Sequence, residues 1–177
     1  MSITYRSVEL PDDVDPLVEF LCAHDWQFHG TPRPTPAEVR AMEFVGPDVA
    51  GFWIIVAGQP VGLIRLFDLG DLDRGSPLFD LRLAPGYRGR GIGTQSVRWL
   101  SDYLLTTYPP LHRIEANTRH DNDAMQRVLE KCGYQLEGRL REAWLSDSGT
   151  RHDTFVYGLL RPDWVASSRQ AGPVDSG

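Results

Sequence analysis

Arginine and glycine alternate along residues 88–93, Arg-Gly-Arg-Gly-Ile-Gly, directly after the apolar run 77–84. We expect this segment to be a turn from a strand into a helix, where the first N–H groups of the helix are unpaired at the positive end of its dipole. Glycines let an anion approach such a backbone closely, and guanidinium groups pair with phosphate through charge-assisted hydrogen bonds. The sequence therefore predicts a phosphate-bearing ligand at residues 88–94, with the hydroxyl of Thr94 as a further donor.

Two common phosphate-binding motifs do not fit this turn. A P-loop ends in Gly-Lys followed by Ser or Thr, whereas this turn ends in Gly93-Thr94 without a lysine. A dinucleotide-binding fingerprint needs a third glycine at its sixth position, and counting from Gly89 that position holds Thr94. Both nucleotide-binding hypotheses therefore fail at the residues that define them.

The turn needs a strand before it and a helix after it, and the hydrophobic pattern supplies both. We expect strands where apolar residues alternate and helices where they recur every three or four residues. The expected strands are 3–10, two runs within 51–69 around the turn Gly58-Gln59, 77–84, 112–118, 134–146 and 152–160, and the expected helices are 11–24, 36–45, 92–108 and 122–133. The strand-helix-strand units over 77–118 and 112–146 predict an α/β fold with a mixed sheet and helices on both faces.

The composition is that of an ordinary folded chain of 177 residues, which we interpret as one domain over 1–165 and an unstructured polar tail over 166–177. A net charge of −6 argues against a nucleic-acid binder and favours cationic partners such as amines. The longest apolar run, 52–57, is too short to span a membrane. Cys22 and Cys132 have neither disulfide-framework nor zinc-ligand spacing, so we expect no metal and a cytoplasmic location.

Two spaced motifs give the chain a family resemblance. Residues 88–93 match the pattern Arg/Gln-x-x-Gly-x-Gly/Ala, and Asn122 heads a stretch that ends in Glu-Lys-Cys-Gly-Tyr at 130–134. In both motifs the chain resembles the GNAT superfamily of acyl-CoA-dependent N-acetyltransferases, and its segment 137–164 is similar to the branch that acetylates the N-termini of ribosomal proteins. Over about residues 3–164, the resemblance implies the α+β GNAT fold, with a mixed central sheet of about seven strands that splays at the acyl-CoA site.

The resemblance implies that acetyl-CoA lies where two neighbouring strands separate. The backbone groups of Leu81 and Leu83 would pair with its pantetheine arm like an added strand, and an N–H group there would stabilise the oxyanion that forms when an amine attacks. Asn122, at the head of its helix, would contact the pantetheine. The pyrophosphate would bind the turn residues Arg88, Gly89, Arg90, Gly91, Gly93 and Thr94.

The acceptor implied by the resemblance is a primary amine, either of a protein N-terminus or of a small molecule. A free α-amine has a pKa of about 7.7–8.0 and a lysine amine one of about 10.4, so some group must accept a proton. Glu115 matches the strand glutamate that serves as general base in the ribosomal-protein branch. The alternative is a structural carboxylate paired with Arg113 or Arg119.

The first two helices and their connector wall the acceptor site in this family. The candidates for substrate binding there are Trp26, Phe28 and His29, although Trp26 and Phe28 would also suit the packed end of the first helix. Asp80 is the fourth candidate, because a charge on a strand that is expected to be buried on both faces needs a reason. The alternative for Asp80 is an ion pair with Arg82 or a contact with the adjacent loop.

The chain departs from the family at the group that protonates the leaving thiolate, which is often a tyrosine or a serine of the second-motif helix. The tyrosine position holds Leu129 and the serine position holds Met125. Tyr134, His120 and Cys132 are further candidates, with no favoured choice among them. A second hypothesis is therefore a CoA-binding module without catalytic activity. For either function, the resemblance allows a homodimer that pairs through the C-terminal strands.

Overall fold

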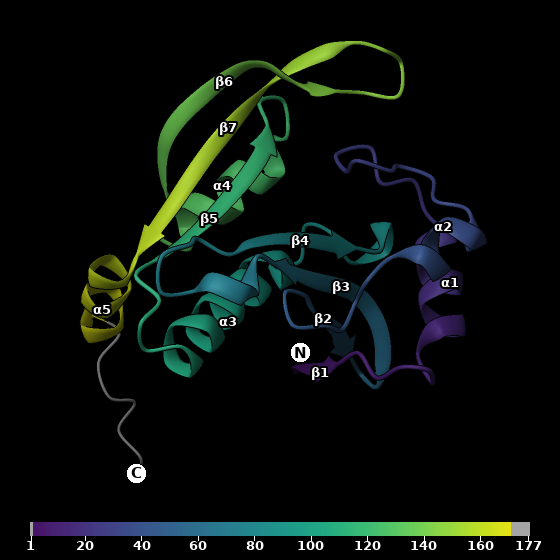
Figure 1. Cartoon of the computed structure of the whole chain (residues 1–177), viewed down its shortest axis with the longest axis horizontal. Helices are drawn as coiled ribbons and strands as arrows, with labels where there is room; N and C mark the ends of the chain where they lie inside the picture. The colour runs from purple at the N-terminus through teal and green to yellow at the C-terminus, as the bar shows by residue number, and fades with distance from the viewer. Residues whose placement is uncertain (1, 171–177) are drawn as a thin grey trace.

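The structure, a computed structural model, describes residues 2–170, apart from the side chains of Asp71 and of residues 168–170 (Figure 1). Its strands are β1 (Ile3–Ser7), β2 (Ala50–Val56), β3 (Gln59–Phe67), β4 (Leu78–Leu83), β5 (Arg113–Arg119), β6 (Gln135–Leu145) and β7 (Arg151–Leu160). Its helices are α1 (Val14–Cys22), α2 (Pro36–Ala41), α3 (Ile92–Thr107), α4 (Asp123–Lys131) and α5 (Arg161–Gln170). The strands and the first four helices confirm the expected elements, with ends that differ by a few residues.

The strands form two antiparallel sheets, β1-β2-β3-β4 and β5-β7-β6. β4 and β5 begin side by side, where the N–H of Glu115 donates to the carbonyl of Pro77 at 3.1 Å, and they then diverge (Figure 1). The expected single mixed sheet is therefore divided in two, because diverging strands do not maintain a hydrogen-bonded ladder.

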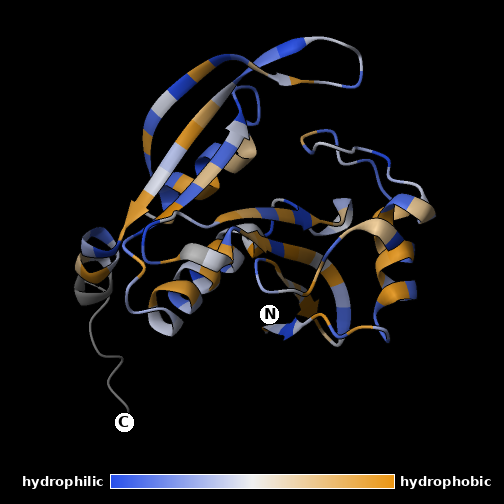
Figure 2. Ribbon diagram, viewed as in Figure 1, coloured by the Kyte–Doolittle hydropathy of each residue, from blue (hydrophilic) through white to orange (hydrophobic). Residues whose placement is uncertain are grey.

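Helices cover both faces of the four-stranded sheet, as expected. Side chains alternate across a strand, so Ile54 of β2 packs with Leu100 of α3 in one core cluster. The neighbouring Trp53 packs with Leu17 of α1 and Val39 of α2 in another cluster. Figure 2 shows hydrophobic residues gathered along this sheet and the helices that face it. On β4, Leu81 and Leu83 pack against the first of these clusters.

Strand β6 forms the exposed edge of the second sheet. Leu136, Leu140 and Leu145 on this strand are 54%, 52% and 59% exposed. These leucines lie in the C-terminal strands through which a homodimer is expected, and the dimer stays a prediction. Among the described residues, none of the helices has the length and apolar character needed to cross a lipid bilayer.

Helix α5 occupies residues 161–170, although an unstructured tail is expected from residue 166 onward. Residues 166–170 are therefore helical, and 171–177 lie outside the described residues. The first residue of α5, Arg161, donates hydrogen bonds to the carbonyls of Leu105, Tyr108 and Leu111 at 2.9, 2.8 and 2.8 Å. Since α3 ends at residue 107, one guanidinium satisfies carbonyls at the end of α3 and ties α5 to it.

We expect Arg161→Ala to lower the free energy of unfolding by about 1–3 kcal/mol, because three carbonyls lose a charged donor. Urea denaturation at neutral pH measures this change. Arg141→Ala is the control, because Arg141 is exposed on β6, and it should change stability by less than about 0.5 kcal/mol. Equal losses in the two variants would contradict the assignment of a capping role to Arg161.

Candidate functional site

The divergence of β4 from β5 leaves one edge of β4 without a strand partner among the described residues. Backbone groups of successive residues point to opposite edges of a strand. Ala84 donates to the carbonyl of Val61 on β3, whereas the carbonyl of Pro77 accepts from β5, so the odd-numbered residues of β4 present their backbone groups to the gap. The N–H and C=O groups of Leu81 and Leu83 therefore face the gap, as their predicted role requires.

A cavity of about 360 Å³ lies along this edge. Its walls are formed by β4, the turn before α3, the helix α4 and the segment after α1. Most of the predicted binding residues line it, namely Trp26, Phe28, His29, Leu81, Leu83, Arg88, Gly89, Gly91, Gly93, Thr94 and Asn122. The fold thus brings the residues expected for the donor and for the acceptor to one cavity, which we call the β4–β5 cavity.

The glycine-rich turn leaves the N-terminus of α3 open at this cavity. Gly89 and Gly91 have positive φ angles of 73° and 79°, a backbone region that costs glycine little and other residues more. Gly91 is the N-cap, and it offers no side-chain acceptor to the helix. The first intrahelical bond runs from Gln95 N–H to the carbonyl of Gly91, so the N–H groups of residues 92–94 are available to a ligand.

The two arginines of the turn have different surroundings. Arg88 lines the cavity, and its Nε donates to the carbonyl of Leu83 at 2.9 Å. Arg90 is exposed and does not line the cavity, and its guanidinium lies 5.5 Å from the ring centre of Tyr87. The structure therefore places Arg88, but not Arg90, beside the open edge of β4.

Helix α4 contributes cavity residues that the sequence analysis missed. Asn122 caps the helix by accepting a hydrogen bond from Met125 N–H at 3.3 Å. The same helix face continues along the cavity with Arg127, Val128 and Lys131. Lys131 follows Val128 by three residues and Arg127 by four, which places the three on one face of the helix. This spacing is visible in the sequence. It puts two more cations beside the glycine-rich turn.

Glu115, the expected general base, is not among the residues that line the β4–β5 cavity. Its carboxylate accepts hydrogen bonds from Arg113 Nη2 and Asn117 Nδ2, both at 3.2 Å. Arg113 also pairs with Glu137 at 2.6 Å. The structure therefore contains the Glu115–Arg113 ion pair that was the alternative to catalysis. A catalytic role for Glu115 stays a prediction.

Asp80 lies behind the cavity wall, in a cluster with Arg82 and His29. Its Oδ2 accepts from Arg82 Nη2 at 3.0 Å, and its Oδ1 lies 2.9 Å from His29 Nε2. Burial by itself would raise the pKa of Asp80, but His29 and Arg82 together outweigh it and lower the pKa to about 2. The structure thus contains the Asp80–Arg82 ion pair that was the alternative to substrate binding by Asp80. The same carboxylate also lies beside His29, which lines the cavity.

The positions that protonate the thiolate in the family hold no proton donor here. Leu129 is fully buried in the core, and Met125 lines the cavity with a thioether. Tyr134 is buried against Ser101, with 3.0 Å between the hydroxyl oxygens, and burial raises its pKa. Burial also raises the pKa of Cys132 to about 11, and its thiol donates to the carbonyl of Thr94. Tyr134, Cys132 and the third candidate, His120, do not line the cavity, and the donor to the thiolate stays unassigned.

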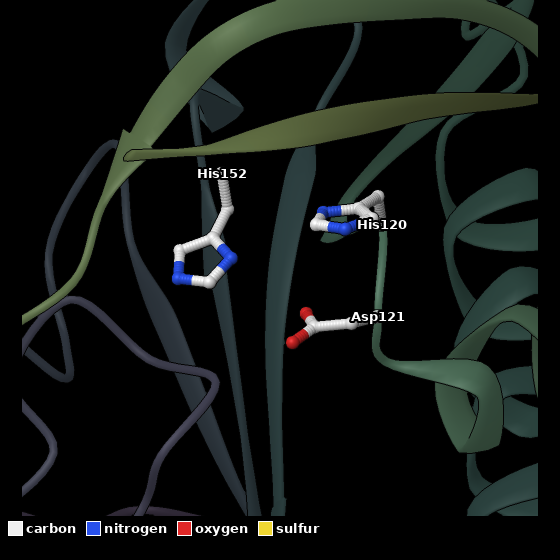
Figure 3. Close-up of side chains that lie close together, drawn as sticks. All are labelled: His120, Asp121 and His152. Atoms are coloured by element: carbon white, nitrogen blue, oxygen red, sulfur yellow. The ribbon is translucent and has the colours of Figure 1, made fainter. Parts of the chain in front are cut away.

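A separate cluster of His120, Asp121 and His152 lies outside the cavity lining (Figure 3). Their potential ligand atoms lie within 4.8 Å of one another. However, Arg119 donates to both carboxylate oxygens of Asp121, at 2.6 and 2.9 Å. Because a guanidinium already neutralises the carboxylate, this cluster is better described as an ion pair beside two imidazoles than as a cation site.

Comparison with protein families gives a match over most of the chain. A family model described as "Acetyltransferase (GNAT) domain" matches residues 3–135. Among solved structures, the RimL ribosomal L7/L12 α-N-protein acetyltransferase in complex with coenzyme A superposes with a TM-score of 0.77. The two chains are 18% identical, and the match covers 90% of this chain and 94% of that one. This likeness concerns the fold.

Curated relatives match a shorter part of the chain. The probable N-acetyltransferase YjcK of Bacillus subtilis is 33% identical over 103 residues, which are 58% of this chain and 56% of YjcK. The spermidine N(1)-acetyltransferase of Escherichia coli K12 is 24% identical over 104 residues, which are 59% of this chain and 50% of that protein. The chain therefore matches about half the length of these two relatives.

The pairing of Asp80 predicts how stability depends on pH. The folded-state pKa of about 2 is below the ordinary value of 3.8, so the ionised carboxylate stabilises the fold above about pH 4, and this contribution is lost as the pH falls to about 2. Urea denaturation of the wild-type protein and of Asp80→Asn should give a difference in unfolding free energy that shrinks by about 2 kcal/mol over this range. A difference that stays constant with pH would contradict this linkage.

Proposed function

The chain belongs to the acetyltransferase (GNAT) family, and we propose that it transfers an acetyl group from acetyl-CoA to a primary amine. The observation that carries this proposal is that one cavity brings together an edge of β4 with no strand partner and a helix start with free N–H groups. The free edge of β4 suits the amide groups of a pantetheine arm, and the open N-terminus of α3 suits a pyrophosphate. A ligand that is extended, amide-bearing and anionic at one end fits both.

The lining of the cavity supports the same donor. Leu81, Leu83, Met125 and Val128 offer apolar contacts to a methylene-rich arm. Arg88, Arg127 and Lys131 add positive charge to the lining, although the chain as a whole carries a net charge of −6. Such a local concentration of cations favours an anionic ligand. Arg90 does not line the cavity, and its contact with the phosphates of acetyl-CoA stays a prediction.

The acceptor is proposed to enter beside Trp26, Phe28 and His29, which line the cavity. Trp26 is 1% exposed and donates to the carbonyl of Leu21, so it also packs at the end of α1. The acceptor is an amine of a protein N-terminus or of a small molecule such as a polyamine, since the relatives include enzymes named for both classes. The acetyl-transfer chemistry is common to the two.

A CoA-binding module without catalysis is the second candidate. It is favoured by one observation, the presence of Leu129 and Met125 where the family has proton donors. The two candidates share the donor site and differ in whether an amine is consumed.

Donor binding is tested by titrating acetyl-CoA into the protein in a calorimeter. We expect the double variant Arg127→Ala, Lys131→Ala to weaken binding about tenfold or more, because two cations that face the phosphates are lost. Arg141→Ala, which removes an exposed cation from β6, is the charge-matched control for a single substitution and should bind acetyl-CoA as the wild type does. Absence of acetyl-CoA binding by the wild type would overturn both candidate functions.

Catalysis is tested by following the release of CoA thiol from acetyl-CoA in the presence of spermidine, or of a short peptide with a free N-terminal alanine or serine. We expect thiol release that depends on one of these amines, with a matching gain of one acetyl group in the mass of the acceptor. Tight acetyl-CoA binding together with no transfer to either class would favour the CoA-binding module.

A further inference from the structure

The imidazole of His29 connects the cavity wall to the buried Asp80–Arg82 pair. Its Nε2 lies 2.9 Å from Asp80 Oδ1 and 3.3 Å from the carbonyl oxygen of Leu81, at the edge of β4 that faces the gap. The side chain of His29 is 19% exposed, and the residue belongs to the cavity lining. One imidazole therefore reaches both a carboxylate and the edge of β4 beside which the proposed thioester lies.

Two acceptors beside Nε2 determine which ring nitrogen of His29 carries a proton. With a pKa of about 2, the Asp80 carboxylate is ionised at neutral pH, and its Oδ1 and the carbonyl oxygen of Leu81 both lie at Nε2, so that Nε2 carries the proton. In the neutral ring Nδ1 then keeps its lone pair. Nδ1 is buried and has no hydrogen-bond partner in the part of the chain that the structure describes. This nitrogen is therefore a proton acceptor with no competing partner there.

The cavity lining offers no second group of this kind. Histidine is the side chain whose ordinary titration falls between pH 5 and 8. Glu115 lies outside the lining, and its carboxylate is engaged by Arg113 and Asn117. The other polar side chains of the lining are those of Gln27, Arg88, Thr94, Asn122, Arg127 and Lys131, which are not of a type that exchanges a proton near neutral pH.

We propose that His29 carries the proton of the reaction from the acceptor amine to the departing thiolate, with Asp80 as its positioning residue. This inference rests on the proposed acetyl transfer. The neutral amine attacks the carbonyl carbon of the thioester, so a C–N bond forms and the C–S bond breaks with its electron pair leaving on sulfur. The nitrogen gives its extra proton to Nδ1, and the imidazolium then gives this proton to the thiolate.

The proposal accounts for the missing donor on α4. A single imidazole that first accepts and then returns one proton needs neither a tyrosine at residue 129 nor a serine at residue 125. The proton balance closes within the cavity, because the amide product and the free thiol carry all the atoms of the two substrates. The ionised Asp80 stabilises the transient imidazolium, and Arg82 holds Asp80 through hydrogen bonds of 3.1 and 3.0 Å.

Access to Nδ1 requires a small movement of the segment that carries His29. This segment is attached by a hydrogen bond from Trp26 N–H to the carbonyl of Pro32. It also contacts β5, where Arg119 reaches the carbonyl of Gln27 and lies over the ring of Phe28. Both attachments lie beside His29, and neither involves its ring. The segment is thus attached to the sheet by contacts other than those of the ring, which lies against Asp80, the carbonyl of Leu81 and Trp26.

The first test reads the ring nitrogens and needs no turnover. Nitrogen-15 NMR of histidine-labelled protein at about pH 8, where an ordinary imidazole is neutral, should show one histidine with a protonated Nε2 and an unprotonated Nδ1. The His29→Gln variant assigns this signal by its loss. Asp80→Asn removes the anionic neighbour of Nε2 but leaves the carbonyl of Leu81, so it should weaken the preference for one nitrogen. A protonated Nδ1 at His29 would overturn the proposal, and an unchanged tautomer population in Asp80→Asn would overturn the positioning role of Asp80.

The second test follows thiol release with acetyl-CoA and whichever of spermidine or the N-terminal peptide the wild type acetylates. His29→Gln should lower kcat by about 10²–10⁴-fold, the range of a lost general acid–base group, while calorimetry gives unchanged acetyl-CoA affinity. His24→Gln is the matched control, because His24 also lies edge-on to Trp26 but does not line the cavity, and it should keep wild-type kcat.

Rescue distinguishes proton transfer from a structural role. Added imidazole should restore part of the activity of His29→Ala, because a small base can occupy the space that the side chain leaves. Full activity of His29→Gln, or a large loss in Glu115→Gln with none in His29→Gln, would overturn the proposal. If the wild type binds acetyl-CoA but acetylates neither amine, the proposed function fails, and the tautomer measurement still decides whether His29 has the required state.

Discussion

The separation of β4 from β5 is the constraint around which the site is built. Two strands that begin at a shared hydrogen bond and then diverge leave a row of backbone groups facing a gap. Side chains satisfy part of this row, since Arg88 donates to Leu83 and His29 lies at the carbonyl of Leu81. A strand edge without a strand partner suits a ligand that pairs with backbone groups.

Charge is distributed unevenly between the surface and this gap. The chain is acidic overall, yet the cavity lining carries Arg88, Arg127 and Lys131. Behind β4, the charges of Asp80 and Arg82 are paired in a buried cluster, which limits the cost of removing them from water. The cluster reaches the cavity through one imidazole. An ionised carboxylate that does not line the cavity thereby contacts a side chain that does.

Much of the architecture follows from local patterns in the sequence. Alternating apolar residues predicted the strands, and the glycine-arginine turn and Asn122 were correctly placed at the starts of α3 and α4. The position of α5 did not follow, because Arg161 is held by carbonyls of a helix more than fifty residues earlier in the chain. Periodicity within a segment carries no information on such a distant partner.

The sequence by itself determined the glycine-arginine turn, the open helix start and the resemblance to a family, because each depends on residues that are neighbours in the chain. Only the tertiary structure decided which charged side chains meet. It directed Arg90 away from the cavity, added Arg127 and Lys131, tied Glu115 to Arg113 and joined His29 to Asp80. Those pairings depend on the direction in which each strand and helix presents its side chains, and that direction is set by packing across the whole fold.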